Sequence, residues 1–382
     1  MAQISQIRRC YNCGAVLQTE DPTKVGYVKK EILENATQNF VFCDKCFELE
    51  RHHPLTNEPS VDPEFLTMLK KAKEKDALIV YVINLFSFEA AFSHAINEIV
   101  QGMNILVVGN KLDLLPAGTN IEDTQEYVAH RFRVSGLTIQ KENVILANAF
   151  DDETAFQVIT RIYELKNGKD VYIIGSELAG KATLTSSFLR VYNNLSQGNI
   201  VTETYPGTSL RMMKIPLNSR SAMYVTPGIS VDNSILHNLD KATLRQIYLT
   251  EPVKGRDITF SSEQVIYFGG IAFIELVKGK KTTLTCYFHE NVQLRKVSAK
   301  KAEDKFVQLI ARKSLKPSLN RIKSVKDMDV FEIKITESNW RDIGIQGLGW
   351  FTFFANAQTF RIYVPKGVSI YTSRPKYIRK KR

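Results

Sequence analysis

The chain has 382 residues, of which 44% are apolar and 24% are charged, with a formal net charge of +11 and a pI near 9.2. This composition excludes a fibrous or disordered protein, and the length allows two or three domains with separate cores. No apolar run is long enough to span a bilayer and no secretory signal is present, so a cytoplasmic protein without membrane attachment is predicted. The positive charge predicts a polyanionic partner, with nucleic acid favoured over an anionic membrane.

The N-terminal part carries two C-x₂-C pairs, Cys10 with Cys13 and Cys43 with Cys46. A two-residue spacer lets both thiolates of a pair reach one ion, and four thiolates complete a closed, structural Zn²⁺ site. Disulfides are disfavoured without a secretion signal, and a redox C-x-x-C needs no second copy. Residues 1–53 are therefore predicted to form a Cys₄ zinc module.

The next part, residues 54–235, alternates strand-like and helical stretches, which is typical of a doubly wound α/β domain with a mostly parallel sheet. Ligands of such sheets bind beyond the carboxyl ends of the strands. The expected strands are 78–84, 104–110, 143–148 and 170–175, with two more ending near 225, and the expected helices lie near 89–101, 122–134 and 152–166 and after Lys181.

The stretch GSELAGKATL, residues 175–184, follows the apolar run VYII. Gly175, Gly180 and Lys181 fit the G-x-x-x-x-G-K spacing of a phosphate-binding loop, in which the lysine contacts the β and γ phosphates. Backbone amides at the start of the following helix hold the other phosphate oxygens. The alternative is a glycine-rich turn with a solvated lysine. The remaining candidate residues of this loop are Ala179, Ala182 and Thr183.

A second motif, N-K-x-D, ends the expected strand 104–110 and consists of Asn110, Lys111 and Asp113. The carboxylate can accept the N1–H and exocyclic amine of guanine, a donor pair that adenine does not offer. We expect the lysine stem to pack over the base and Asn110 to tie the base loop to the phosphate loop. Guanine nucleotide, GTP or GDP, is therefore the predicted ligand.

In this chain the base motif precedes the phosphate loop, the reverse of the order in ordinary GTPases. The chain resembles the circularly permuted GTPases, and specifically the YqeH family of bacterial ribosome-assembly GTPases. The resemblance extends to TYPGTSL and YVTPGI, which look like the two switch segments of the family, and to FGGIAF, GLGW and VPKGVS downstream. It implies a permuted P-loop G domain and an N-terminal zinc ribbon. The further site residues that it implies are Ala147 and Asn148 at the guanine, Thr208 and Gly228 in the switches, and Lys181 and Thr208 as catalytic candidates.

The sequence departs from the family pattern at positions that supply oxygen donors to catalytic cations. Leu178 replaces an asparagine, Ala182 a serine and Val225 an aspartate. Losing these donors is expected to weaken Mg²⁺ binding more than tenfold and to leave GTP hydrolysis weak or lost. An active GTPase with an unusual metal shell and a nucleotide-independent RNA-binding factor remain alternatives. Asn84 and Ser87 also stand where the family tends to have aspartates.

Residues 236–382 are predicted to form a β-rich basic α+β domain. Residues 292–326 hold eleven Lys or Arg against two acidic residues, and residues 374–382 add six basic residues. Two such clusters favour contact with rRNA and, by the resemblance, with the small ribosomal subunit. The sequence leaves the oligomeric state open. Four strand aromatics are candidates for base stacking, although a core position is the favoured interpretation: Tyr267, Phe268, Trp350 and Phe351.

Overall fold

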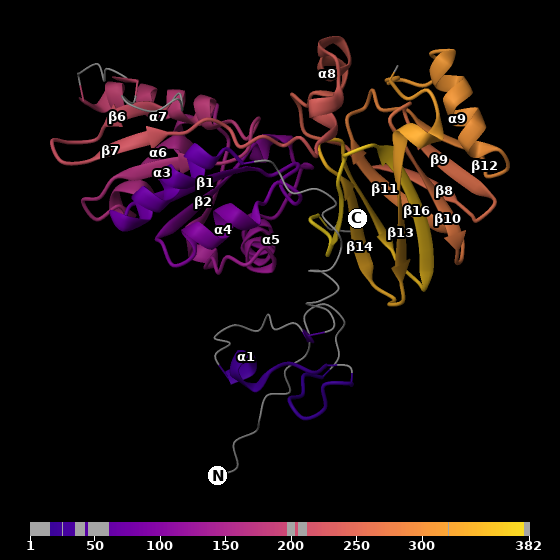
Figure 1. Cartoon of the computed structure of the whole chain (residues 1–382), viewed down its shortest axis with the longest axis horizontal. Coiled ribbons are helices and arrows are strands. Elements are labelled where there is room, and N and C mark those ends of the chain that lie inside the picture. The colour runs from indigo at the N-terminus through magenta and orange to yellow at the C-terminus, as the bar shows by residue number, and fades with distance from the viewer. Residues whose placement is uncertain are drawn as a thin grey trace.

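The protein is described by a computed structural model in which two large parts lie side by side, an α/β part and a β-sandwich (Figure 1). Three of the predicted zinc ligands, Cys10, Cys13 and Cys46, lie outside the described residues, so the zinc module stays a prediction; Cys43 is buried. None of the helices in the described ranges is long and apolar enough to cross a membrane. The described residues are 16–24, 26–34, 43–44, 61–196, 203–204, 212–319 and 321–377.

The α/β part contains a seven-stranded sheet with the order β3-β2-β1-β4-β7-β6-β5. The first five strands of this order are parallel, and β6 runs antiparallel to β7 and β5. The elements up to this sheet's end are α1 (Lys30–Glu34), α3 (Pro63–Glu74), β1 (Leu78–Asn84), α4 (His94–Val100), β2 (Ile105–Asn110), η1 (Leu112–Leu114), α5 (Ile121–Val134), η2 (Lys141–Asn143), β3 (Val144–Ala147), α6 (Asp152–Leu165), β4 (Val171–Ile174), α7 (Lys181–Ser196), β5 (Glu203–Thr204), β6 (Met213–Pro216) and β7 (Ala222–Val225).

Helices cover both faces of this sheet, which explains why its central strands are apolar at nearly every position. In β1, side chains alternate between the faces: Ile79 and Tyr81 pack with α3, α4 and α5, whereas Val80 and Val82 pack with α6 and α7. The predicted α/β class with a mostly parallel sheet is thereby confirmed.

Polar side chains fix where the helices of this part begin. The Asp62 carboxylate accepts a hydrogen bond from Glu64 N at 2.8 Å at the start of α3, where Pro63 takes a position that needs no amide donor. The Asn120 side chain caps α5 in the same way through Asp123 N, at 2.9 Å. These caps pair backbone amide groups that the first turn of each helix would otherwise leave without a partner.

The C-terminal part is a sandwich of two five-stranded antiparallel sheets, ordered β12-β9-β10-β16-β13 and β17-β14-β15-β11-β8. The predicted β-rich C-terminal region is confirmed. Its elements are η3 (Ile235–Asn238), α8 (Lys241–Ile247), β8 (Arg256–Phe260), β9 (Gln264–Phe268), β10 (Ala272–Lys278), β11 (Thr282–Phe288), β12 (Leu294–Ser298), α9 (Ala302–Ala311), η4 (Val325–Asp327), β13 (Met328–Ile335), β14 (Trp340–Ile345), β15 (Gly349–Phe354), β16 (Gln358–Pro365) and β17 (Ile370–Ser373).

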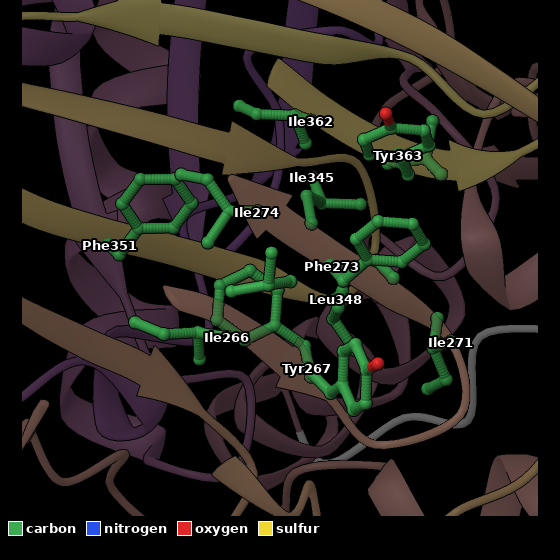
Figure 2. Close-up of a cluster of buried hydrophobic side chains, with 14 of the residues drawn as sticks. Ile266, Tyr267, Ile271, Phe273, Ile274, Ile345, Leu348, Phe351, Ile362 and Tyr363 are labelled. Atoms are coloured by element: carbon green, nitrogen blue, oxygen red, sulfur yellow. The ribbon is translucent and has the colours of Figure 1, made fainter. Parts of the chain in front are cut away.

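The core of the sandwich is aromatic and aliphatic (Figure 2). Phe273 and Tyr363 stack with ring centroids 4.0 Å apart, and Phe306 of α9 covers Phe273 at 4.7 Å. Tyr267, Phe268 and Phe351 are fully buried in this core, and Trp350 is fully buried in the hydrophobic cluster of the α/β part. The core interpretation of these four residues is correct, because a fully buried ring offers no face to a nucleobase.

The two parts are joined by a buried polar network in which the end of the chain returns to the loop after β1. Lys376 Nζ pairs with the Glu89 carboxylate and donates to the carbonyls of Leu85 at 2.9 Å and Phe86 at 3.1 Å. Gly347 N donates to Ser87 Oγ at 2.8 Å. A hydroxyl at position 87 therefore serves the contact between the domains, which gives a physical account of the serine there.

Candidate nucleotide-binding site

The loop of residues 175–180 joins β4 to α7 and is packed tightly against two neighbouring strands. Gly175 and Gly180 have φ angles of 146° and 89°, in a region that side chains disfavour. A Cβ atom at Gly175 would lie 2.1 Å from the Val82 carbonyl oxygen, and one at Gly180 would lie 2.3 Å from Asn110 Nδ2. Both glycines are thus required by space as well as by backbone conformation.

Lys181 begins α7 and folds back over the loop. Its Nζ donates to the Gly175 carbonyl at 2.7 Å and to the Ser176 carbonyl at 3.0 Å, and the side chain is buried. Burial lowers the pKa of Lys181 to about 8, and the nearby Glu177 carboxylate partly opposes this shift. The ammonium group therefore lies within the loop that the sequence predicts to bind phosphates.

Asn110 joins the three loops of the site. Its Nδ2 donates to the Ala179 carbonyl at 2.8 Å, and its Oδ1 accepts from Ala149 N at 3.1 Å. The side chain is almost fully buried, at 1% exposure. This is the link between base loop and phosphate loop that the sequence predicts, while contact of these residues with a base stays a prediction.

Lys111 and Asp113 lie at the same edge of the sheet. Lys111 adopts a left-handed conformation with φ of 67°, and Asp113 is in the short helix η1 and is half-buried. Lys111 Nζ lies 5.3 Å from the ring centroid of Tyr248, which follows α8. The sequence gives no signal for Tyr248, because it belongs to the segment that leads into the second domain.

The two residues expected at the guanine oxygen lie at the end of β3. Ala147 is buried, and Asn148 is half-buried. The Asn148 amide donates to Thr154 Oγ1 at 3.3 Å, a long bond for this donor. A guanine O6 at this amide would have to displace the Thr154 hydroxyl.

Comparisons with known proteins find relatives of this chain. Residues 281–375 match the family described as YqeH-like, C-terminal. The chain is 28% identical over 365 residues to the YqeH protein of Bacillus subtilis (strain 168), covering 96% of this chain and 98% of that protein. These likenesses support membership of the YqeH family. The chain is also 23% identical over 390 residues to NO-associated protein 1, chloroplastic/mitochondrial, of Arabidopsis thaliana, over 89% of this chain and 68% of that protein, and 22% identical over 255 residues to nitric oxide-associated protein 1 of Mus musculus, over 54% and 36%.

The positions where the YqeH pattern has cation-binding oxygens carry apolar side chains in this structure. Leu178 is 47% exposed with a left-handed φ of 59°, and Ala182 is exposed at the start of α7. Val225 of β7 is buried in the hydrophobic cluster that includes residues of α6 and α7. Thr226 Oγ1 donates to the Ile173 carbonyl at 2.9 Å. Thr208 lies outside the described residues. None of the three replaced side chains, Leu178, Ala182 and Val225, offers an oxygen donor to a Mg²⁺ ion.

The segment after β7 is seated directly on the phosphate loop. Glu177 N donates to the Ile229 carbonyl at 2.9 Å, and Ile229 N donates to the Gly175 carbonyl at 3.1 Å. A Cβ atom at Gly228 would lie 2.7 Å from Glu177 Cγ. This segment is therefore tied to the phosphate loop by two backbone hydrogen bonds and a close backbone approach.

Glu177 is a site residue that motif matching misses, since the phosphate-loop pattern places no restriction on its position. Its Oε2 lies 3.8 Å from Nδ1 of His237 in η3, where the chain enters the second domain. The carboxylate is close enough to Lys181 to oppose the shift in the lysine pKa. An acidic residue inside a loop expected to bind anions is the sequence signal that identifies it.

The basic cluster of residues 292–326 forms a surface around β12 and α9. Ten of its eleven Lys and Arg side chains are exposed, and Arg295 is half-buried. Of the acidic residues, Glu303 accepts a hydrogen bond from the Tyr363 hydroxyl at 2.7 Å. In the C-terminal cluster, by contrast, Lys376 is buried between the domains, so its charge is not part of an external basic surface as the sequence suggested.

Proposed function

We propose that this chain binds a guanine nucleotide at the phosphate loop and N-K-x-D motif and acts, in the cytoplasm, in the assembly of the small ribosomal subunit, with weak or lost GTP hydrolysis. The observation that carries the nucleotide assignment is the Asn110 side chain, which bonds to both the phosphate loop and the base loop. Membership of the YqeH family supports the role in ribosome assembly.

The strand order supports a circularly permuted P-loop G domain. The phosphate-loop strand β4 lies between β1 and β7 although it is fourth along the chain, and the base-motif strand β2 lies beside β1. Because β1, β2 and β4 are parallel, the loops after β2 and β4 meet at one edge of the sheet. Ligands of parallel sheets bind at such an edge.

The proposal of weak hydrolysis rests on the missing oxygen donors. In phosphoryl transfer a metal ion neutralises charge on the β and γ oxygens, and little other chemistry is left to the protein. Leu178, Ala182 and Val225 offer no side-chain oxygen for this purpose. Lys181 retains a cation at the loop, which supports binding of the phosphate chain without efficient turnover.

Titration of the purified chain with fluorescent GDP, with and without Mg²⁺, tests this proposal. We expect micromolar affinity that changes less than about tenfold with Mg²⁺, loss of binding in Lys181→Ala, and GTP turnover far below that of active relatives. Ala182→Ser is the matched variant, since it restores one hydroxyl at an exposed position and is expected to increase the effect of Mg²⁺. Turnover at ordinary family rates, abolished by Lys181→Ala, would favour the active GTPase, whereas no nucleotide affinity would favour a scaffold.

We infer that rRNA contacts the exposed basic surface around α9. Binding of small subunits should then weaken steeply with salt, because each neutralised phosphate releases counterions. Replacing Lys300, Lys301 and Lys305 by alanine is expected to reduce the salt dependence by about one unit of slope for each phosphate that is no longer neutralised. The control is the same change at three exposed lysines, Lys70, Lys71 and Lys75, at the other domain's helix α3. A flat salt response of the wild type would contradict the inference.

A further inference from the structure

The outer face of the sheet β17-β14-β15-β11-β8 is covered at one end and open at the other. At the covered end, Trp350 and Tyr287 pack in the hydrophobic cluster of the α/β domain. At the open end, Trp340 pairs directly with Phe354 across β14 and β15. Along β14, Asp342 lies opposite Thr352 and Gly344 lies opposite Trp350. Because alternate residues of a strand point to the same face, Trp340 and Phe354 share a face with Thr352 and Trp350.

The Trp340–Phe354 pair is exposed to an unusual degree for large aromatic residues. Trp340 is 47% exposed and Phe354 is 48% exposed. Their ring centroids are 5.7 Å apart with an interplanar angle of 79°, an edge-to-face arrangement. Two adjacent large rings left in solvent do not gain the free energy of burying their apolar surface. Their exposure therefore favours a binding role over a purely structural one.

Three exposed lysines lie at the same end of the sandwich as the pair. The hairpin between β10 and β11 carries the exposed residues Lys278, Lys280 and Lys281. This hairpin lies at the same end of the sandwich, because Gln358 Nε2 donates to the Lys280 carbonyl at 2.9 Å and Gln358 follows Phe354 after a short turn. The Ser338 hydroxyl donates to Asn356 Oδ1 at 3.3 Å, which joins the turns that flank the two rings.

We propose that Trp340 and Phe354 form a stacking platform for an unpaired base of single-stranded RNA, with the lysines of the β10–β11 hairpin contacting the flanking phosphates. This inference rests on the proposed interaction with rRNA and assigns to it a second contact, separate from the basic surface around α9. Aromatic side chains bind any base through its ring face, and lysines follow the backbone, so such a site is tolerant of sequence. The three lysines at this end of the sandwich favour a polyanion over an apolar protein segment.

Intrinsic fluorescence gives a direct test, because the chain has two tryptophans and Trp350 is fully buried. Titration of the full chain with a single-stranded RNA of about 12 nucleotides should quench the exposed Trp340. Trp340→Ala should weaken binding roughly 5- to 100-fold, whereas Trp340→Phe should keep most of the affinity and lose the quenching. Phe156→Ala, at a residue of α6 that is 49% exposed, is the matched control and should leave affinity unchanged.

The possible outcomes separate this inference from the proposed function. Salt-dependent RNA binding by the wild type, without quenching and with full affinity in Trp340→Ala and Phe354→Ala, would overturn the platform and leave the basic surface standing. Absence of RNA binding by the wild type would refute the interaction with RNA itself. Loss of subunit binding in Trp340→Ala with unchanged oligonucleotide affinity would assign the pair to a protein contact, which also overturns the inference.

Discussion

The buried ion pair between Lys376 and Glu89 gives the sharpest prediction about how the two domains are held together. Lys376 is 6% exposed and Glu89 is 0% exposed, and the ammonium group also serves the carbonyls of Leu85 and Phe86. The Lys376 Nζ atom lies 4.5 Å from the ring centroid of Trp350. Lys376→Met keeps most of the side-chain volume and removes the charge.

The expected cost follows from what the substitution leaves behind. The Glu89 carboxylate keeps hydrogen bonds from the Tyr127 hydroxyl and Phe88 N, both at 3.0 Å, but loses its countercharge in a site without water access. Removing one partner of a buried ion pair costs about 3–5 kcal/mol. The free energy of unfolding of Lys376→Met should fall by about this amount.

Urea denaturation followed by tryptophan fluorescence measures this loss, since Trp350 lies beside the pair. The double variant Lys376→Met with Glu89→Leu should recover most of the stability, because an apolar pair can replace a buried ion pair of similar volume. The control, Lys70→Met at an exposed position of α3, should change stability by less than about 0.5 kcal/mol. A loss below about 1 kcal/mol in Lys376→Met, or no recovery in the double variant, would refute the reasoning.

Three further predictions concern pH and close packing. Burial raises the pKa of Asp342 to about 7 from its ordinary 3.8, so between these values the folded chain holds a proton that the unfolded chain has lost. The free energy of unfolding should therefore fall as pH rises from about 4 to 7, by up to about 1.4 kcal/mol per pH unit. Asp342→Asn should flatten this slope in urea titrations. Because burial lowers the pKa of Lys181 to about 8, affinity for fluorescent GDP should fall above that pH, by up to about tenfold per unit. Lys181→Arg, whose guanidinium stays charged, should remove the dependence. An unchanged wild-type affinity up to pH 9.5 would show that this ammonium does not hold phosphate. Gly228→Ala should destabilise the chain by about 1–3 kcal/mol, since its Cβ would meet Glu177 at 2.7–2.9 Å, and equal midpoints in urea would contradict the close contact.

The elements that form the candidate site were predictable because their signals are local. The apolar run of β1 predicts a strand buried on both faces, and the glycine spacing of residues 175–180 predicts a tight loop before a helix. The two motifs follow β2 and β4, which lie on either side of β1 in the sheet. The zinc module stays a prediction, since three of its four cysteines lie outside the described residues.

The sequence by itself determined which residues form strands, helices and the phosphate loop, because hydrophobic period and turn chemistry act over a few neighbouring residues. Only the tertiary structure decided that Lys376 is buried against Leu85, 291 residues away, and that Trp350 is covered by the other domain while Trp340 on the same face is exposed. Those outcomes depend on how two domains dock, and docking brings together residues whose separation in sequence carries no periodic signal. A lysine in a basic tail and a tryptophan in a strand have the same local pattern whether a second domain covers them or leaves them in water.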